Sequence, residues 1–141
     1  MLEIFGGKFT MIALITSNLV AIISAALLSF AFGMIWYNPK VFGAAWVAEQ
    51  PHRKMPDDFQ KDMGKGMIAS LVDALFFATM ALLLLVAYKI EGVLILAASV
   101  TIGIYTNTIF KGGTTRLFLI DAGYLLCQLI IITATILIIS G

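Results

Sequence analysis

Four long apolar stretches, separated by short polar segments, make up most of the chain. About 20 residues of α-helix cross a hydrocarbon core about 30 Å thick, and each stretch contains about that many residues. The last two connections are short, which forces neighbouring helices to run antiparallel. We therefore predict a single domain over residues 1–141, an all-α integral membrane bundle of four antiparallel transmembrane helices spanning about 11–36, 67–88, 93–110 and 117–139.

The segment after the first span combines a helix start with an amphipathic pattern. Asn38 is a favourable N-cap, and Pro39 then occupies the first helical position. Apolar side chains recur on one side of the next turns, which suits a short helix lying in the headgroup plane; the alternative is an irregular loop. We predict this interfacial helix within a first cytoplasmic loop of residues 38–65. Its motif comprises Trp36, Tyr37, Pro39, Phe42, Gly43 and Trp46.

The composition excludes several classes of protein. The chain is 61% hydrophobic and 12% charged, whereas a soluble domain carries about 25% charged residues. Its net charge of +1 offers no basic surface for nucleic acid, so no such partner is expected. One histidine, His52, and one cysteine, Cys127, provide neither a metal site nor a nucleophile with its base. We therefore expect no metal, no cofactor and no enzymatic activity.

The distribution of Lys and Arg predicts the orientation of the chain, because cytoplasmic loops carry an excess of these residues. Most of them lie in the first and third connections, and few lie in the N-terminal segment and the second connection. This asymmetry places the first and third connections in the cytoplasm and both termini outside. The first group is Lys40, Arg53, Lys54, Lys61, Lys65, Lys111 and Arg116, and the second is Lys8 and Lys89.

The first apolar stretch carries a small residue at every fourth position. Small side chains at this spacing lie on one face of a helix and let a second backbone approach closely. We interpret this face as a packing ridge and predict a homo-oligomer, most simply a dimer through the first helix. The alternative is an alanine-rich helix with no special partner. The ridge consists of Ala21, Ala25, Ser29 and Gly33.

Polar residues within the spans form the candidate site. Asp73 lies in the second span and Asp121 in the fourth, and charged groups at membrane depth are costly and default to a functional hypothesis. Asp121, Tyr124, Gln128 and Thr135 share one stripe of an otherwise apolar helix. The third span has a small, polar face of Ser99, Gly103 and Thr106. We expect an intramembrane polar site formed by Asp73, Asn107, Asp121, Tyr124 and Gln128, with Arg116 at its rim.

This polar site has two interpretations. In the first, Asp73 and Asp121 are titrating carboxylates that bind a proton or a small cation. In the second, the polar groups make hydrogen bonds between helices, and Asp121 forms an ion pair with Arg116 near the membrane interface. Such hydrogen bonds contribute only about 0.6 kcal/mol each on average, so several of them can serve to fix helix register. The shallow depth of Asp121 favours the structural interpretation.

Two segments resemble a known family. Residues 36–46 read WYNPKVFGAAW and resemble the W-Y-x-P-x-x-F-G-x-x-W signature of domain-of-unknown-function family 1761, a group of small bacterial membrane proteins. Residues 119–125 read LIDAGYL and resemble its last helix, typically I-N-A-G-Y-H. The resemblance implies a four-helix, multi-pass protein of the inner membrane and no established activity. In this chain Asp121 stands where the family usually has Asn, and Leu125 stands where His is common. If Asn suffices in relatives, a titrating carboxylate is not required at position 121, which argues against Asp121 as an obligatory proton carrier.

Three functions remain open at this point. The packing ridge, and the lack of a catalytic or metal-binding motif in the sequence, favour a non-enzymatic, oligomeric scaffold or partner subunit in the lipid bilayer. The alternative is a small proton- or cation-coupled transporter or channel that uses Asp73 and Asp121. An intramembrane enzyme built on the same two aspartates is the least favoured of the three.

Overall fold

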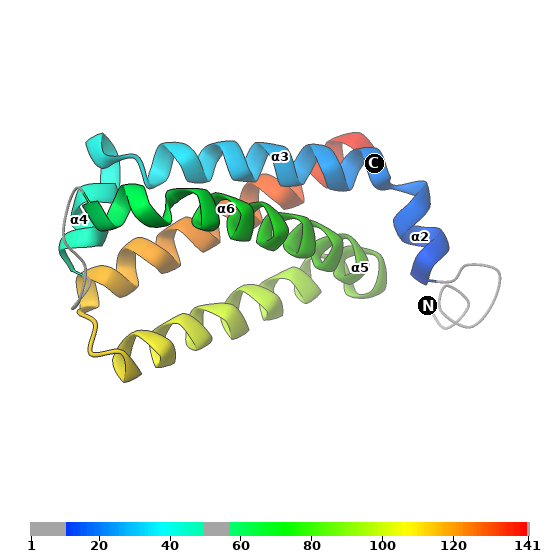
Figure 1. The fold of residues 1–141 in the computed structure, drawn as a ribbon. Helices are drawn as coiled ribbons and strands as arrows, with labels where there is room; N and C mark the ends of the chain where they lie inside the picture. The colour runs from blue at the N-terminus through cyan, green and yellow to red at the C-terminus, as the bar shows by residue number, and fades with distance from the viewer. Residues whose placement is uncertain (1–10, 50–56, 141) are drawn as a thin grey trace.

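The chain is helical throughout the part that the computed structural model describes, which is the backbone of residues 11–49 and 57–140 and the side chains of 11–49 and 64–140. These residues contain no β-strand. Lys8, Arg53 and Lys54 lie outside this part, as does the side chain of Lys61, so it does not test their place in the charge distribution. The elements are α2 (Met11–Ser17), α3 (Leu19–Trp36), the π-helix η1 (Pro39–Gly43), α4 (Ala44–Ala48), α5 (Asp57–Phe110) and α6 (Thr115–Ser140) (Figure 1).

Three of these helices are long and apolar enough to cross a membrane. They are Leu19–Trp36, residues 64–110 of α5, and Thr115–Ser140, as found among the described residues. Exposing such apolar surfaces to water is unfavourable. In lipid they are compatible with the surroundings, because an α-helix makes all its backbone hydrogen bonds within itself. The all-α class is confirmed, and the composition of these helices is that of a membrane protein.

The first predicted span is divided into two helices at Asn18, which has φ −120° and ψ 22°. Three consecutive polar side chains bond to backbone carbonyls one turn earlier. Thr16 Oγ1 donates to the carbonyl of Ile12, Ser17 Oγ donates to Ala13 over 2.8 Å, and Asn18 Nδ2 donates to Leu14 over 2.9 Å. Side chains that bond in this way compete with the helical ladder and bend it. α2 therefore points away from the axis of α3 (Figure 1).

The 54-residue helix α5 is interrupted at one residue, Lys89, whose φ of 56° and ψ of −150° are non-helical. The break falls where the sequence predicts a tight connection. We call residues 57–88 the first arm and residues 90–110 the second arm, and the ribbon of α5 turns back between them (Figure 1). Gly92 permits this close turn, because a Cβ there would come within 3.0 Å of the Leu84 carbonyl oxygen.

A second glycine closes the turn between α5 and α6. Gly112 has φ +72°, a left-handed conformation that glycine adopts without the strain other residues incur. The Gly113 amide then donates to the Thr108 carbonyl over 2.8 Å, which satisfies one carbonyl at the end of α5. α6 begins two residues earlier than the sequence predicts and continues to Ser140.

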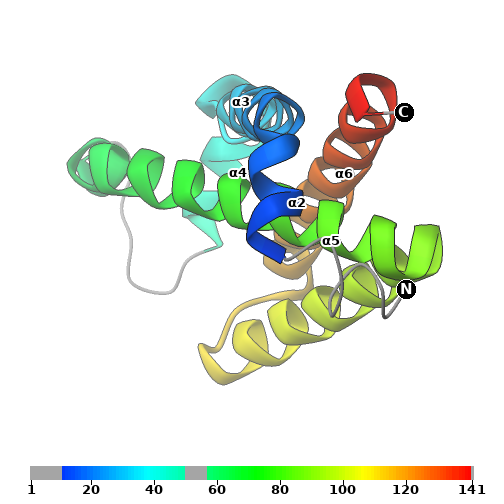
Figure 2. The same cartoon turned by 90° about the vertical axis from the view of Figure 1, so that its right-hand side faces the viewer.

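The core lies between α3, the first arm of α5 and α6. Residues from these three elements form one hydrophobic cluster, including Ala25 of α3, Ala78 of the first arm and Ile132 of α6, all fully buried. The second arm lies to one side of this group (Figure 2). Only Gly92, Val93 and Thr108 are buried within it. The fold is thus a three-helix core with a peripheral fourth arm.

The small-residue ridge of α3 faces this core. Ala21, Ala25 and Ser29 are at most 1% exposed, and Gly33 lies against the ring of Tyr124 on α6. The ridge therefore brings helices of one chain together, and it is not available to a second copy. The homo-oligomer stays a prediction, but the surface expected for it is wrong.

Enlarging a ridge residue should destabilise the fold. We expect Ala25→Leu to lower the free energy of unfolding by about 1–3 kcal/mol, because the added carbons have no space between α3 and its neighbours. Thermal unfolding of the detergent-solubilised protein, followed by size-exclusion chromatography, measures the effect. Ala31→Leu is the matched control, since Ala31 is exposed on the same helix. Equal melting temperatures for the two variants would contradict the inward-facing ridge.

Candidate functional site

The interfacial motif folds as a compact turn beyond the end of α3. Asn38 caps η1, and its Oδ1 accepts a hydrogen bond from the Lys40 amide over 2.9 Å. The Gly43 amide donates to the Asn38 carbonyl over 2.9 Å, five residues back, which makes this a π-helical turn. A Cβ on Gly43 would lie 2.1 Å from the Tyr37 carbonyl oxygen. Only glycine fits this position. A short helical segment is present after α3 as η1 followed by α4, and its placement in the headgroup plane stays a prediction.

Asp121 connects this turn to α6. The Tyr37 hydroxyl donates to Asp121 Oδ1 over 2.7 Å, and the Trp46 indole Nε1–H donates to the same oxygen over 2.9 Å. We call this pair of hydrogen bonds the Asp121 clamp. Hydrogen bonds to a charged acceptor are stronger than those between neutral groups. The clamp therefore fixes both ends of the motif to one point of the last helix.

The Tyr37 hydroxyl acts as the donor in this clamp. Tyr37 follows the last residue of α3, outside the membrane-spanning segment. Burial, together with the adjacent Asp121 carboxylate, raises the pKa of Tyr37 above its ordinary value. The phenol consequently keeps its proton at any physiological pH, and the hydrogen bond to Asp121 does not switch off in that range.

Two glycines allow α3 and α6 to meet beside the clamp. The Trp36 Nε1–H donates to the Ile120 carbonyl over 3.1 Å. The Trp36 ring covers Gly123, where a Cβ would lie 3.2 Å from the ring. Gly33 makes the reciprocal contact with Tyr124, since its Cβ would lie 2.7 Å from the phenolic oxygen. α3 and α6 thus interlock through two aromatic–glycine contacts, Trp36 on Gly123 and Tyr124 on Gly33.

The aromatic rings at this end form a continuous group. Tyr37 makes edge contacts with Trp46 and Tyr124, at centroid distances of 5.5 and 5.1 Å. Trp36 packs on Phe42 at 4.5 Å. Aromatic pairs at these distances contribute about 0.5–1.5 kcal/mol beyond the area they bury. The predicted motif residues are therefore brought together as a structural unit.

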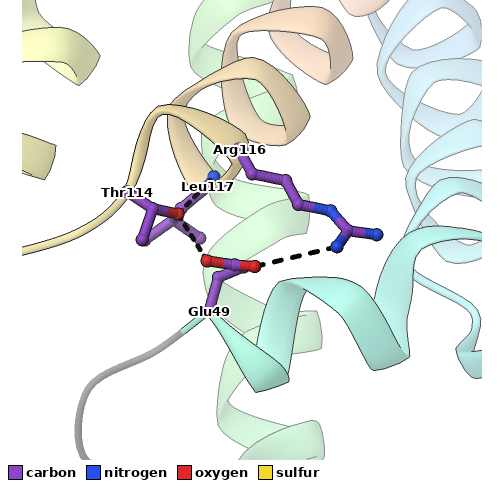
Figure 3. A network of polar contacts seen from close by, with 4 residues as sticks. All are labelled: Glu49, Thr114, Arg116 and Leu117. Atoms are coloured by element: carbon purple, nitrogen blue, oxygen red, sulfur yellow. Dashed lines mark hydrogen bonds and ion pairs between the residues drawn. The ribbon is translucent and has the colours of Figure 1, made fainter.

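Arg116 was expected at the rim of the polar site beside Asp121, but it lies next to Glu49 at the end of α4. Its guanidinium pairs with Glu49 at the end of α4, with 3.8 Å between Nη1 and Oε1. The Thr114 hydroxyl donates to the other carboxylate oxygen of Glu49 over 2.5 Å and accepts from the Leu117 amide over 3.2 Å (Figure 3). The expected Asp121–Arg116 ion pair is wrong, because the Asp121 clamp and Glu49 engage these two groups separately.

Asp73 and Gln128 form a second, deeper polar group. Asp73, in the first arm of α5, is exposed, and its carboxylate lies near the side chains of Gln128 and Tyr124 on α6. Gln128 is 0% exposed, yet neither its Oε1 nor its Nε2 makes a hydrogen bond of ordinary geometry. A buried amide without partners is costly. Gln128 is therefore a buried polar side chain whose hydrogen-bonding capacity is unused among the described residues.

The other predicted polar residues do not join this group. Ser99, Gly103, Thr106 and Asn107 are all exposed on the second arm of α5, so the expectation that Asn107 faces a shared pocket is wrong. Thr135 is nearly buried, and its hydroxyl donates to the Ile131 carbonyl over 2.7 Å. Among the described residues no three His, Cys, Asp or Glu side chains cluster as metal ligands.

A groove of about 820 Å³ opens between α3, the beginning of α5 and α6. Its walls include Phe30 and Met34 of α3, Met67 of α5, and Tyr124 of α6. Lys65 and Asn38 also line it. This volume is in the range of small-molecule sites, which lie between about 300 and 1,000 Å³. The groove was not predicted, because no sequence pattern indicates where helices diverge.

Comparison with known proteins identifies a family. The model of a family described as protein of unknown function, DUF1761, matches residues 20–137. Both segments that carry the resemblance, and every residue of the Asp121 clamp, lie inside this range. No curated protein and no solved structure matches the chain.

Removing one donor of the Asp121 clamp should loosen the end of the bundle. We expect Tyr37→Phe to lower the free energy of unfolding by about 1–2 kcal/mol, between the ~0.6 kcal/mol average for membrane hydrogen bonds and the ~3 kcal/mol of bonds to charged groups. Thermal unfolding in detergent measures the loss. Tyr105→Phe removes an exposed hydroxyl on the second arm and should change little.

The acceptor can be tested in the same assay. Asp121→Asn keeps an oxygen at the position of Oδ1 and should retain most of the stability, whereas Asp121→Leu should lose both bonds. If Asp121→Leu melted like the unaltered protein, the clamp would have no structural role.

Proposed function

This chain belongs to the DUF1761 family of proteins of unknown function, and we propose that it is a non-enzymatic membrane scaffold or partner subunit. The Asp121 clamp is the observation that supports this proposal. Asp121 is one of the two intramembrane acids, and one of its oxygens accepts hydrogen bonds from two donors on other elements. Contacts of this kind hold α3, α4 and α6 in a fixed arrangement, as a structural role for Asp121 requires.

The proposed arrangement has four antiparallel crossings of the inner membrane, with both termini outside. The reversal at Lys89 and the glycine turn at Gly112 support it, since they divide α5 and α6 into three apolar segments. Lys40, Lys65, Lys111 and Arg116 belong to the connections assigned to the cytoplasm, as the excess of positive charge on that side requires.

The second arm of α5 is the surface we propose for a second copy. Ser99, Gly103 and Asn107 follow one another at every fourth position, and all three are exposed. A Cβ on Gly103 would meet no heavy atom within 4 Å. Small residues permit close helix approach in membranes, and an amide or hydroxyl can bond across the contact. Lipid tails offer such polar groups no partner, whereas the same face of another copy does.

A bulky residue at Gly103 should break this assembly. We expect the unaltered protein to be a dimer in mild detergent and Gly103→Ile to be largely monomeric, because the branched side chain holds the two backbones apart. Light scattering coupled to size-exclusion chromatography measures the mass. Gly64→Ile is the matched control, since Gly64 is an equally open glycine of the first arm and its replacement should leave the dimer intact. A monomeric unaltered protein would refute the proposal.

A second candidate function rests on Asp73 and Gln128. The Asp73 carboxylate lies beside the Gln128 amide, which makes no hydrogen bond among the described residues. An intramembrane carboxylate is the kind of group that binds a proton or a small cation along a membrane path. This favours the transporter or channel alternative with Asp73 as its central residue. Asp121 would then support the helices only.

Flux measurements separate the two candidates. If the chain conducts, liposomes containing it should take up protons or Na⁺, and Asp73→Asn should abolish at least about nine-tenths of that flux by removing the charge that offsets the cost of a buried cation. Asp121→Asn should leave the flux nearly unchanged. Liposomes with and without the protein should behave alike if it is a scaffold.

A further inference from the structure

The groove between α3, the first arm of α5 and α6 has two chemically different ends. Asn38 and Lys65 lie at the end next to η1, and Phe30 lies deeper. Phe30 precedes Trp36 by six helical positions, which is about 9 Å along the helix axis. Trp36 and Trp46 mark the level of the membrane interface. The groove therefore extends from the headgroup level into the acyl region of the same leaflet.

The deeper walls are apolar and adaptable. Phe30, Met34 and Met67 line this part together with Ala69, and methionine side chains adjust to irregular apolar partners. The first arm of α5 diverges from α3 here, since residues 64–70 are all exposed. An apolar chain entering from the bilayer would fill this space without loss of hydrogen bonds.

The outer end carries a positive charge from Lys65, the one charged residue among the described residues that line the groove. Lys65 lines the groove and makes no ion pair or hydrogen bond with any residue that the structure describes. A lysine at this level attracts the anionic lipids of the cytoplasmic leaflet. The Asn38 side-chain amide, which also lines the groove, is a further donor for phosphate oxygens.

We propose that this groove binds one anionic membrane phospholipid, with an acyl chain against Phe30, Met34 and Met67 and the phosphate at Lys65. The lipid closes the gap that the diverging first arm leaves beside α3. This binding does not depend on the scaffold function, because it needs only the groove and its charge.

Native mass spectrometry tests the proposal on the full chain. The protein, stripped of lipid in detergent, is titrated with phosphatidylglycerol and with phosphatidylcholine of identical acyl chains. We expect one phosphatidylglycerol to bind more tightly than phosphatidylcholine. Lys65→Gln should weaken phosphatidylglycerol binding about fivefold, the effect of one basic residue at a membrane surface. Lys111→Gln, at an exposed lysine outside the groove, should not.

A second variant tests the acyl site. Ala69→Phe fills the groove and should reduce the binding of both lipids, whereas Ala98→Phe, on the exposed second arm, should reduce neither. Equal affinities for the Lys65 and Lys111 variants, or unchanged binding by Ala69→Phe, would overturn the proposal. If Ala69→Phe does not fold, the comparison of the two lysine variants decides.

Discussion

The two hydrogen bonds that Asp121 accepts from Tyr37 and Trp46 determine the geometry of one whole end of the bundle. Tyr37 directly follows α3 and Trp46 lies in α4, so a single carboxylate oxygen holds both segments against α6. The aromatic contacts, the covered Gly123 and the Glu49 network all lie around this point. The contacts of Trp36 with Gly123 and of Gly33 with Tyr124 require α3 and α6 at their present separation, which the clamp and the buried ridge set together.

Much of the fold follows from local pattern. The apolar stretches predicted the helices, the Asn38–Pro39 pair predicted the start of η1, and the connection at Lys89 predicted the break in α5. The small residues of α3 correctly predicted a close helix contact. These features depend on neighbours in sequence, where spacing and propensity determine the outcome.

The candidate site was less predictable, because its contacts join residues 75 and 84 positions apart. Tyr37 and Trp46 have an ordinary explanation as interfacial aromatics, which concealed their role as donors. Periodicity also shows which residues share a face without showing where the face points. The ridge of α3 was therefore assigned outward although Ala25 is buried, and the polar face of the second arm was assigned inward although Asn107 is exposed.

The distance of the clamp along the chain affects the order of biogenesis. A ribosome delivers Tyr37 and Trp46 to the membrane long before Asp121 is synthesised. During that interval the Trp46 indole and the Tyr37 phenol have no acceptor on α6, and the π-helical turn lies at the headgroup level without these two hydrogen bonds. Completion of the interfacial motif thus depends on insertion of the final helix. A nascent chain arrested before Asp121 would expose the aromatic residues of this motif without their hydrogen bonds to Asp121.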